Sequence, residues 1–178
     1  MNNTEQKVII PCRFSYLHCW EPVIVKDSGP RYSVSAIIPK SDTATLNAIK
    51  AAIEVAKNES LSKWGGKIPP NLKLPLRDGD IDRPDDEAYA GCYFLNANSR
   101  QQPQVVDSRV QPILNQSDVY SGCYGKISVT FYGYNTNGNR GIAAGLGNIQ
   151  KLRDGESLGG RVNASEEFES VEDEDFLN

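Results

Sequence analysis

Residues 124–134 read YGKISVTFYGY, and this stretch decides the fold class. Successive side chains of a β-strand point to opposite sides, so Ile127, Val129 and Phe131 share one side and form a set typical of a core. The residues of the other side are Tyr124, Lys126, Ser128, Thr130, Tyr132 and Tyr134. The alternation therefore predicts a strand with one buried face and one polar, aromatic face.

The aromatic face predicts contact with nucleic acid. Every base has a π-face whatever its identity, a base stacked on an aromatic ring contributes roughly 1–3 kcal/mol, and a nearby cation such as Lys126 holds phosphates. Tyrosine also favours strands for reasons of packing alone, so a helix or loop that covers the face is the alternative. We expect Tyr124, Tyr132 or Tyr134 to contact a base.

Further strand signals lie on both sides of this stretch. Alternating or β-favouring residues occur at 8–17, 31–39, 92–97, 104–106 and 141–152. Apolar residues that recur at spacings of three and four predict one helix, which begins at Ser41 or Asp42 and ends near Leu61. Short strands with long connections favour a small antiparallel Greek-key barrel of the oligonucleotide-binding type over a sandwich, whose turns recur every eight to twelve residues or so.

The loop at 65–90 contains many Gly, Pro and Asp residues, which exclude a regular element of any length. A loop of this length inside a compact domain is usually functional or held by its own contacts. It includes the acidic run at 78–87, DGDIDRPDDE.

Charge is unevenly distributed along the chain. Residues 166–178 carry seven acids and no base, so the net charge of −4 leaves +3 for the rest. Residues 78–87 carry six acids and one base, a net of −5, so the remainder carries +8. We therefore predict a mildly basic domain at 1–164 and an acidic tail at 165–178.

Basic residues close to the predicted strands and loops are candidate phosphate ligands. They are Arg31, Lys63, Lys67, Lys73, Arg77 and Arg140. Trp64 lies between Lys63 and Lys67 in a Gly-containing loop, where an exposed indole stacks a base. An anchor that packs the end of the helix onto the barrel is an equally good interpretation of Trp64.

The acidic tail is predicted to bind partner proteins. Its acids prevent independent folding, yet it keeps aromatic residues that a solubilising tail does not require. The candidate partner-binding residues are Phe168, Asp173, Glu174, Asp175 and Phe176. A tethered acidic peptide also competes with DNA for a basic groove at high effective concentration, and salt weakens this competition. A solubility tail is the alternative.

The sequence gives little support to an enzyme. The four cysteines form no CxxC pair and His18 is the single histidine, so we expect no catalytic residues, no metal site, no cofactor and reduced thiols. A Mg²⁺-dependent nuclease using the run at 78–87 is the main rival, although its acids are consecutive and suit a solvated loop. An adaptor that binds only proteins is a third reading. No apolar stretch is long enough for a membrane span, which favours the cytosol.

Several motifs resemble those of a family of phage single-stranded-DNA-binding proteins. The resemblance rests on RFSYLHCWEP at 13–22, YSVSAIIPKSD at 32–42, KWGGKIPPNLKLPLRDGD at 63–80, RPDDEAYAG at 83–91, NTNGNRGIAAGLGNIQ at 135–150 and the acidic end. It implies an oligonucleotide-binding fold, weakly sequence-dependent binding of single strands, and a role in replication or recombination of phage DNA in the cytoplasm of the infected bacterium.

The last residues of the chain differ from those of bacterial proteins with this function, and the resemblance does not fix the oligomeric state. In bacterial proteins of this functional class the tail ends on phenylalanine, whereas Leu177 and Asn178 follow Phe176 here. A host pocket that reads a terminal phenylalanine carboxylate is therefore not expected to accept this tail. Replication or recombination proteins remain the expected partners, and both a monomer and a homodimer are compatible with the sequence.

Overall fold

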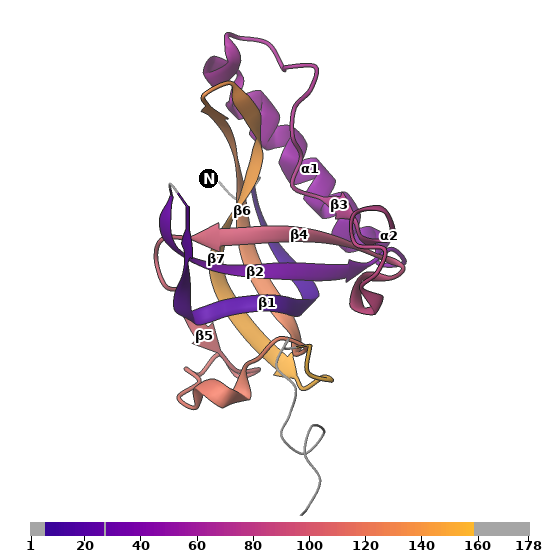
Figure 1. The fold of residues 1–178 in the computed structure, drawn as a ribbon, viewed down its shortest axis with the longest axis vertical. Coiled ribbons are helices and arrows are strands. Elements are labelled where there is room, and N and C mark those ends of the chain that lie inside the picture. The colour runs from indigo at the N-terminus through magenta and orange to yellow at the C-terminus, as the bar shows by residue number, and fades with distance from the viewer. Residues whose placement is uncertain (1–5, 27, 159–178) are drawn as a thin grey trace, which may run out of the picture.

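The computed structural model describes residues 6–26 and 28–158, and seven strands form its one sheet (Figure 1). The strands are β1 (Lys7–Val25), β2 (Gly29–Pro39), β3 (Arg77–Asp78), β4 (Cys92–Ser99), β5 (Val105–Val106), β6 (Tyr124–Thr136) and β7 (Asn139–Arg153). The helices are α1 (Thr43–Glu59) and α2 (Gly79–Asp82), with short 3-10 turns η2 (Leu61–Trp64), η3 (Glu87–Tyr89) and η4 (Gln116–Asp118). Each predicted strand range and the predicted helix are confirmed.

Five of the strands close into a barrel. Antiparallel pairs join β4 to β2, β2 to β1, β1 to β6 and β6 to β7. A short parallel pairing then joins β4 back to β7, with Ala97 opposite Ala144 and Asn98 opposite Gly145. The barrel is of the predicted oligonucleotide-binding type, although its closing seam is parallel rather than antiparallel.

The predicted inner face of β6 lies in the barrel core. Ile127, Val129 and Phe131 are buried and pack with apolar residues of β1, β2, β4 and β7. Helix α1 buries the expected stripe against the same core, and the Asp42 side chain caps it by accepting a hydrogen bond from the Thr45 N–H. In the part of the chain that is described, no helix is long and apolar enough to cross a membrane.

The loop after η2 is held by a small second core outside the barrel. Tyr89 packs edge-on against Phe94 of β4 with ring centroids 5.0 Å apart, and Ile37 of β2 completes the cluster. The Tyr89 hydroxyl donates to Ser35 Oγ at 2.9 Å, so its one polar atom is satisfied in the buried site. This loop therefore covers one end of the outer face of β2 and β4.

Trp64 fastens the end of the helical segment to the β6–β7 hairpin. Its indole is buried, and Nε1 donates to the Tyr134 carbonyl at 2.9 Å. Lys63 Nζ donates to the Gly133 carbonyl at 2.7 Å, while Ser60 Oγ accepts from the Gly133 N–H at 3.0 Å. A Cβ on Gly133 would lie 2.9 Å from Trp64 Cζ2, so only glycine permits this approach. The expectation that Trp64 is an exposed stacking surface is wrong, because anchoring consumes both its ring and its N–H.

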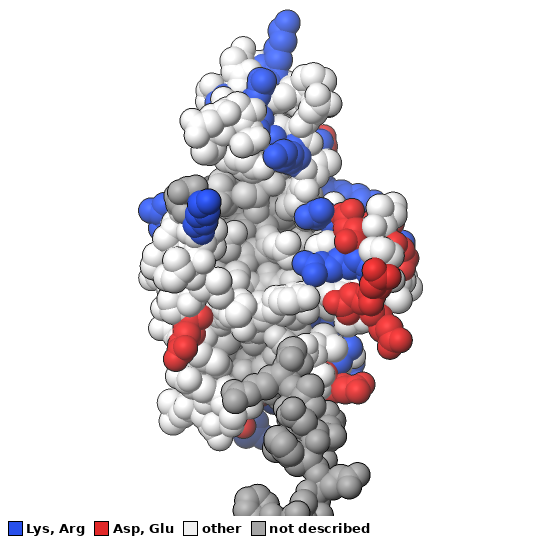
Figure 2. Space-filling view, viewed as in Figure 1, with Lys and Arg blue, Asp and Glu red and all other residues white. Residues whose placement is uncertain are grey.

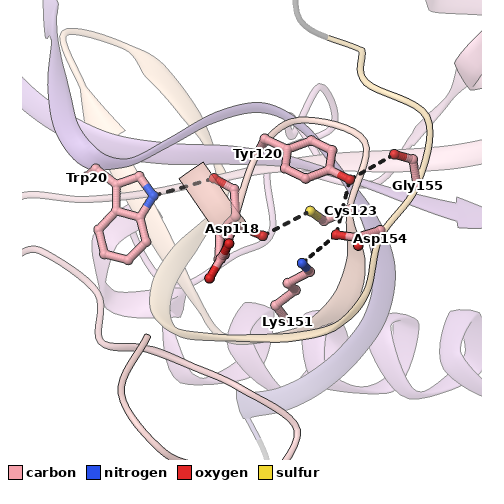
Figure 3. Close-up of polar contacts among 8 residues, drawn as sticks. Trp20, Asp118, Tyr120, Cys123, Lys151, Asp154 and Gly155 are labelled. Atoms are coloured by element: carbon pink, nitrogen blue, oxygen red, sulfur yellow. Dashed lines mark hydrogen bonds and ion pairs between the residues drawn. The ribbon is translucent and has the colours of Figure 1, made fainter. Parts of the chain in front are cut away.

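A polar cluster fixes the end of β7 (Figure 3). The Tyr120 hydroxyl lies 3.2 Å from Asp154 Oδ1 and 3.0 Å from the Gly155 carbonyl, and Lys151 Nζ pairs with Asp154 at 2.5 Å. The Lys151 ammonium and the Tyr120 hydroxyl hold the pKa of the Asp154 carboxyl below its ordinary value. Trp20 Nε1 donates to the nearby Val119 carbonyl at 3.4 Å. The chain therefore leaves the barrel at a defined place.

Trp64→Ala should lower the free energy of unfolding by about 3–5 kcal/mol, because it empties a buried ring site and removes the hydrogen bond to the Tyr134 carbonyl. Trp64→Phe, which keeps most of the ring, should cost clearly less. Urea unfolding followed by far-UV circular dichroism measures both, with Tyr132→Ala on the exposed side of β6 as the matched aromatic deletion. A free energy of unfolding for Trp64→Ala within about 1 kcal/mol of the parent would contradict the anchoring role, because ordinary point mutants show changes of that size.

Candidate nucleic-acid interface

An open groove, here called the Tyr132 groove, crosses the outer face of β2 and β4. It consists of two adjoining hollows of about 620 and 580 Å³, which share Asn96, Asn98, Tyr134 and Ala143. The β1–β2 hairpin and the β6–β7 hairpin border it. Figure 2 shows this face hollowed below the β6–β7 hairpin, with Lys and Arg side chains on both sides of the hollow.

A bulge in β1 directs Tyr16 into the groove. Ser15 pairs with Ser35 and His18 pairs with Ser33, so β1 has one residue more than β2 in this interval. Tyr16 has a φ of +45°, in the left-handed region that side chains rarely adopt, and it is 52% exposed. Bulges of this kind re-aim a side chain. Strand alternation gave no signal for Tyr16, and sequence reasoning missed it.

Arg83 reaches the groove from the acidic run. Its guanidinium carbon lies 5.0 Å from the ring centroid of Tyr16, 5.2 Å from that of Tyr89 and 5.7 Å from that of Phe94. Nη1 also donates to the Tyr16 hydroxyl at 3.4 Å. Within the described residues no carboxylate pairs with Arg83, so aromatic rings orient a charge that stays available. Sequence reasoning missed Arg83 because acids surround it.

Three of the six acids of that run pair with neighbouring cations. Lys40 Nζ lies 2.8 Å from Asp78 and 2.7 Å from Asp80, and Arg77 Nε lies 2.8 Å from Asp82. The carboxylates of Asp78 and Asp80 raise the pKa of Lys40, while Lys40 and a backbone N–H lower the pKa of Asp80. Over residues 6–26 and 28–158, no three His, Cys, Asp or Glu side chains are grouped to hold a metal ion.

The thiols are not placed for nucleophilic chemistry. All four cysteines are free, and Cys12, Cys19 and Cys123 are buried. Burial raises the pKa of Cys12 well above its ordinary value and that of Cys19 to about 12. Because the thiolate is the nucleophilic form, these two groups are inert at neutral pH.

The fold brings together about half of the predicted binding residues. Tyr132, Tyr134, Arg31, Lys73 and Arg77 line the Tyr132 groove. Arg140 joins Lys73 in a further hollow of about 290 Å³ at the tip of the β6–β7 hairpin. Arg31 is held by Ser28 Oγ at 2.8 Å and Asn98 Oδ1 at 3.4 Å, which points it along the groove.

The other predicted residues lie elsewhere, because β6 coils around the barrel and its outer residues face in different directions. Tyr124 lies in a separate hollow beside Arg13 and Arg153, and Lys126 lies in another beside Lys7. Ser128 is buried, where its Oγ accepts from the Asn148 N–H at 2.8 Å. The three tyrosines therefore do not form one surface. Lys63 is tied to Gly133, and Lys67 is exposed in the loop after η2.

The candidate partner-binding residues lie outside the described residues. They are Phe168, Asp173, Glu174, Asp175 and Phe176 of the predicted acidic tail.

The floor of the groove is polar and uncharged. Ser33 and Ser35 of β2 lie beside Asn96 and Asn98 of β4, and among the residues that the structure describes no Asp or Glu lines either hollow. Hydroxyl and amide groups donate and accept hydrogen bonds, which suits base edges of any identity. Exposed rings, fixed guanidinium groups and an acid-free floor together fit a strand that offers π-faces and phosphates.

Comparison with known proteins shows the family of the chain. The family model described as Enterobacter phage Enc34, ssDNA-binding protein, matches residues 6–177. Putative protein p50 of Acyrthosiphon pisum secondary endosymbiont phage 1 is 36% identical over 180 residues, which are 93% of this chain and 95% of that protein.

Solved structures extend the comparison. The single-stranded DNA-binding protein from bacteriophage Enc34 in complex with ssDNA has a TM-score of 0.77 at 26% identity, over 86% of this chain and 90% of that chain. The single-stranded DNA binding protein gp2.5 of bacteriophage T7 has a TM-score of 0.59 at 14% identity, over 90% of this chain and 98% of that chain, a likeness of fold alone. The chain therefore belongs to the family of phage single-stranded-DNA-binding proteins defined by that of Enterobacter phage Enc34.

Proposed function

We propose that this protein binds single-stranded DNA in the Tyr132 groove without strong sequence preference, and that it protects and organises DNA during phage replication or recombination. The observation that carries the proposal is the meeting of exposed Tyr132 and Tyr16 with the guanidinium groups of Arg31 and Arg83 in one open groove. Binding breaks no bond, so the proposed role is not enzymatic.

The position of the groove supports this proposal. Barrels of this type bind oligonucleotides on the face of their second and third strands, between the loops that join strands one to two and four to five. Here β2 and β4 are the second and third barrel strands, and the two bordering hairpins join β1 to β2 and β6 to β7. In such a site rings stack bases of any identity, whereas cations follow the backbone, which explains tolerance of sequence.

The acidic tail is part of the proposal. Its aromatic residues Phe168 and Phe176 and the acids between them recruit replication or recombination proteins, and its charge opposes DNA binding. A tethered segment acts at high effective concentration, so this opposition to DNA binding is strong at low salt and weak at high salt.

Fluorescence anisotropy of a labelled oligothymidine and of a matching duplex, over a salt series with EDTA and then Mg²⁺, tests the proposal. We expect tight capture of the intact single strand that does not depend on metal. Cleavage that requires Mg²⁺ would support a nuclease using the acidic run at 78–87. Absence of binding at every salt concentration would leave a protein-binding adaptor.

Tyr132→Ala should weaken single-strand binding by roughly 1–3 kcal/mol, the usual contribution of one stacked base, because it removes an exposed ring from the groove. Tyr132→Phe keeps the ring and serves as the matched control, with an expected affinity close to that of the parent. The same anisotropy titration measures both variants. Equal losses for the two variants would assign the effect to the hydroxyl and contradict stacking.

Arg83→Gln should reduce the dependence of affinity on salt. If Arg83 neutralises one phosphate, the slope of log K against log salt concentration should become shallower by about 0.7. Arg109→Gln, an exposed arginine outside the groove, is the control and should leave the slope unchanged. A weaker affinity with an unaltered slope would show that Arg83 only supports Tyr16 and contacts no phosphate.

A further inference from the structure

A second cationic and aromatic hollow lies beyond the loop that bounds the Tyr132 groove. This Tyr124 hollow has a volume of about 460 Å³ and apolar walls that include Pro11, Ile37 and Leu152. The guanidinium carbon of Arg153 lies 4.1 Å from the Tyr124 ring centroid, and that of Arg13 lies 5.2 Å from it. Nothing in the proposed DNA site uses these groups.

Most of the charged side chains that line the hollow are cations. Within the described residues these cations form no ion pair with a carboxylate. Among the described residues, Arg13 donates to carbonyl oxygens, from Nε to Gly122 at 3.1 Å and from Nη2 to Glu156 at 2.7 Å. No ion pair engages Arg13 or Arg153 within residues 6–26 and 28–158. The one carboxylate in the lining, Asp42, already caps helix α1. The hollow therefore suits a ligand that carries both carboxylates and an apolar group.

The described chain ends beside this hollow. Leu158 packs against the cluster of Ile37, Tyr89 and Phe94, and its N–H donates to the Ser121 carbonyl at 2.8 Å. Ile37 belongs both to this cluster and to the wall of the hollow. Phe168 follows ten residues later, a reach of up to about 35 Å for extended chain.

We propose that residues 166–178 dock in the Tyr124 hollow of their own chain. Phe168 or Phe176 packs against the apolar walls, and neighbouring carboxylates pair with Arg13 and Arg153. Three observations favour this occupant: the segment holds seven acids and no base, it carries spaced aromatic residues, and it starts close to the hollow. Tethering gives it a high effective concentration that a separate peptide lacks.

Docking in this hollow would restrain DNA binding without filling the Tyr132 groove. Ser35 lines the groove and Ile37 lines the hollow, two residues apart on β2, which corresponds to roughly 7 Å. That distance is within the Debye length of about 10 Å at 0.1 M salt. The docked acids therefore lower the positive potential at the end of the groove. This consequence rests on the proposed function, whereas the docking itself does not.

Photo-crosslinking of the full-length chain tests the docking without DNA. Benzoylphenylalanine replaces Phe168 in one protein and Phe176 in another, and mass spectrometry maps the crosslinks after irradiation. We expect crosslinks to segments that contain Pro11 to Arg13, Tyr124 or Leu152, with yields that fall as salt rises. Crosslinks to Tyr16 or Tyr132 would place the segment in the DNA groove and overturn the proposal. So would crosslinks that join differently isotope-labelled copies, because they mean docking between chains.

Arg153→Glu in the full-length chain gives a second test, because the proposal expects this variant to bind single strands more tightly. It should abolish the crosslinks and tighten single-strand binding at low salt by about fivefold, the lower end of coupling between two sites. Arg153→Gln should act in the same direction and guards against misfolding of the charge reversal. Arg109→Glu carries the same charge change elsewhere on the surface and should not tighten binding. A fall in affinity for Arg153→Glu would mean that Arg153 contacts DNA and would overturn the proposal.

Discussion

The parallel pairing of β4 with β7 is the constraint on which the rest of the structure depends. It is short, yet it converts a twisted sheet into a closed barrel and satisfies backbone groups that would otherwise form open edges. It also places the outer residues Asn96 and Asn98 of β4 beside Ala143 of β7. Barrel closure therefore adds β7 to a groove whose floor lies on β2 and β4.

Local neutralisation lets an acidic chain carry a basic groove. Lys40 and Arg77 pair with Asp78, Asp80 and Asp82, so three of the six acids of the run at 78–87 are partly compensated where they lie. Arg83 of the same run is oriented by aromatic rings instead of carboxylates. The formal charge of a segment thus says little about the potential that its neighbouring groove presents to a phosphate.

The loop containing Tyr89 shapes the outer face of the barrel. Its small core with Ile37 and Phe94 divides that face into a wide groove and a narrower, more apolar hollow. The groove combines rings with an acid-free floor, which suits a nucleic-acid strand. The hollow combines two neighbouring guanidinium groups with apolar walls, which suits an acidic peptide. A loop that cannot form regular structure therefore partitions the surface by side-chain packing alone.

The sequence by itself determined the barrel class, the strand ranges, helix α1 and the buried set Ile127, Val129 and Phe131, because periodicity is a local property of the chain, while the structure chose Asp42 over Ser41 as the helix cap. It also indicated the groove residues Tyr132, Tyr134 and Arg31. Only the tertiary structure separated Tyr124 from them, buried Trp64 and brought Tyr16 and Arg83 together. Alternation says which residues face outward, whereas the coiling of β6, the bulge in β1 and the loop packing decide which outward residues meet.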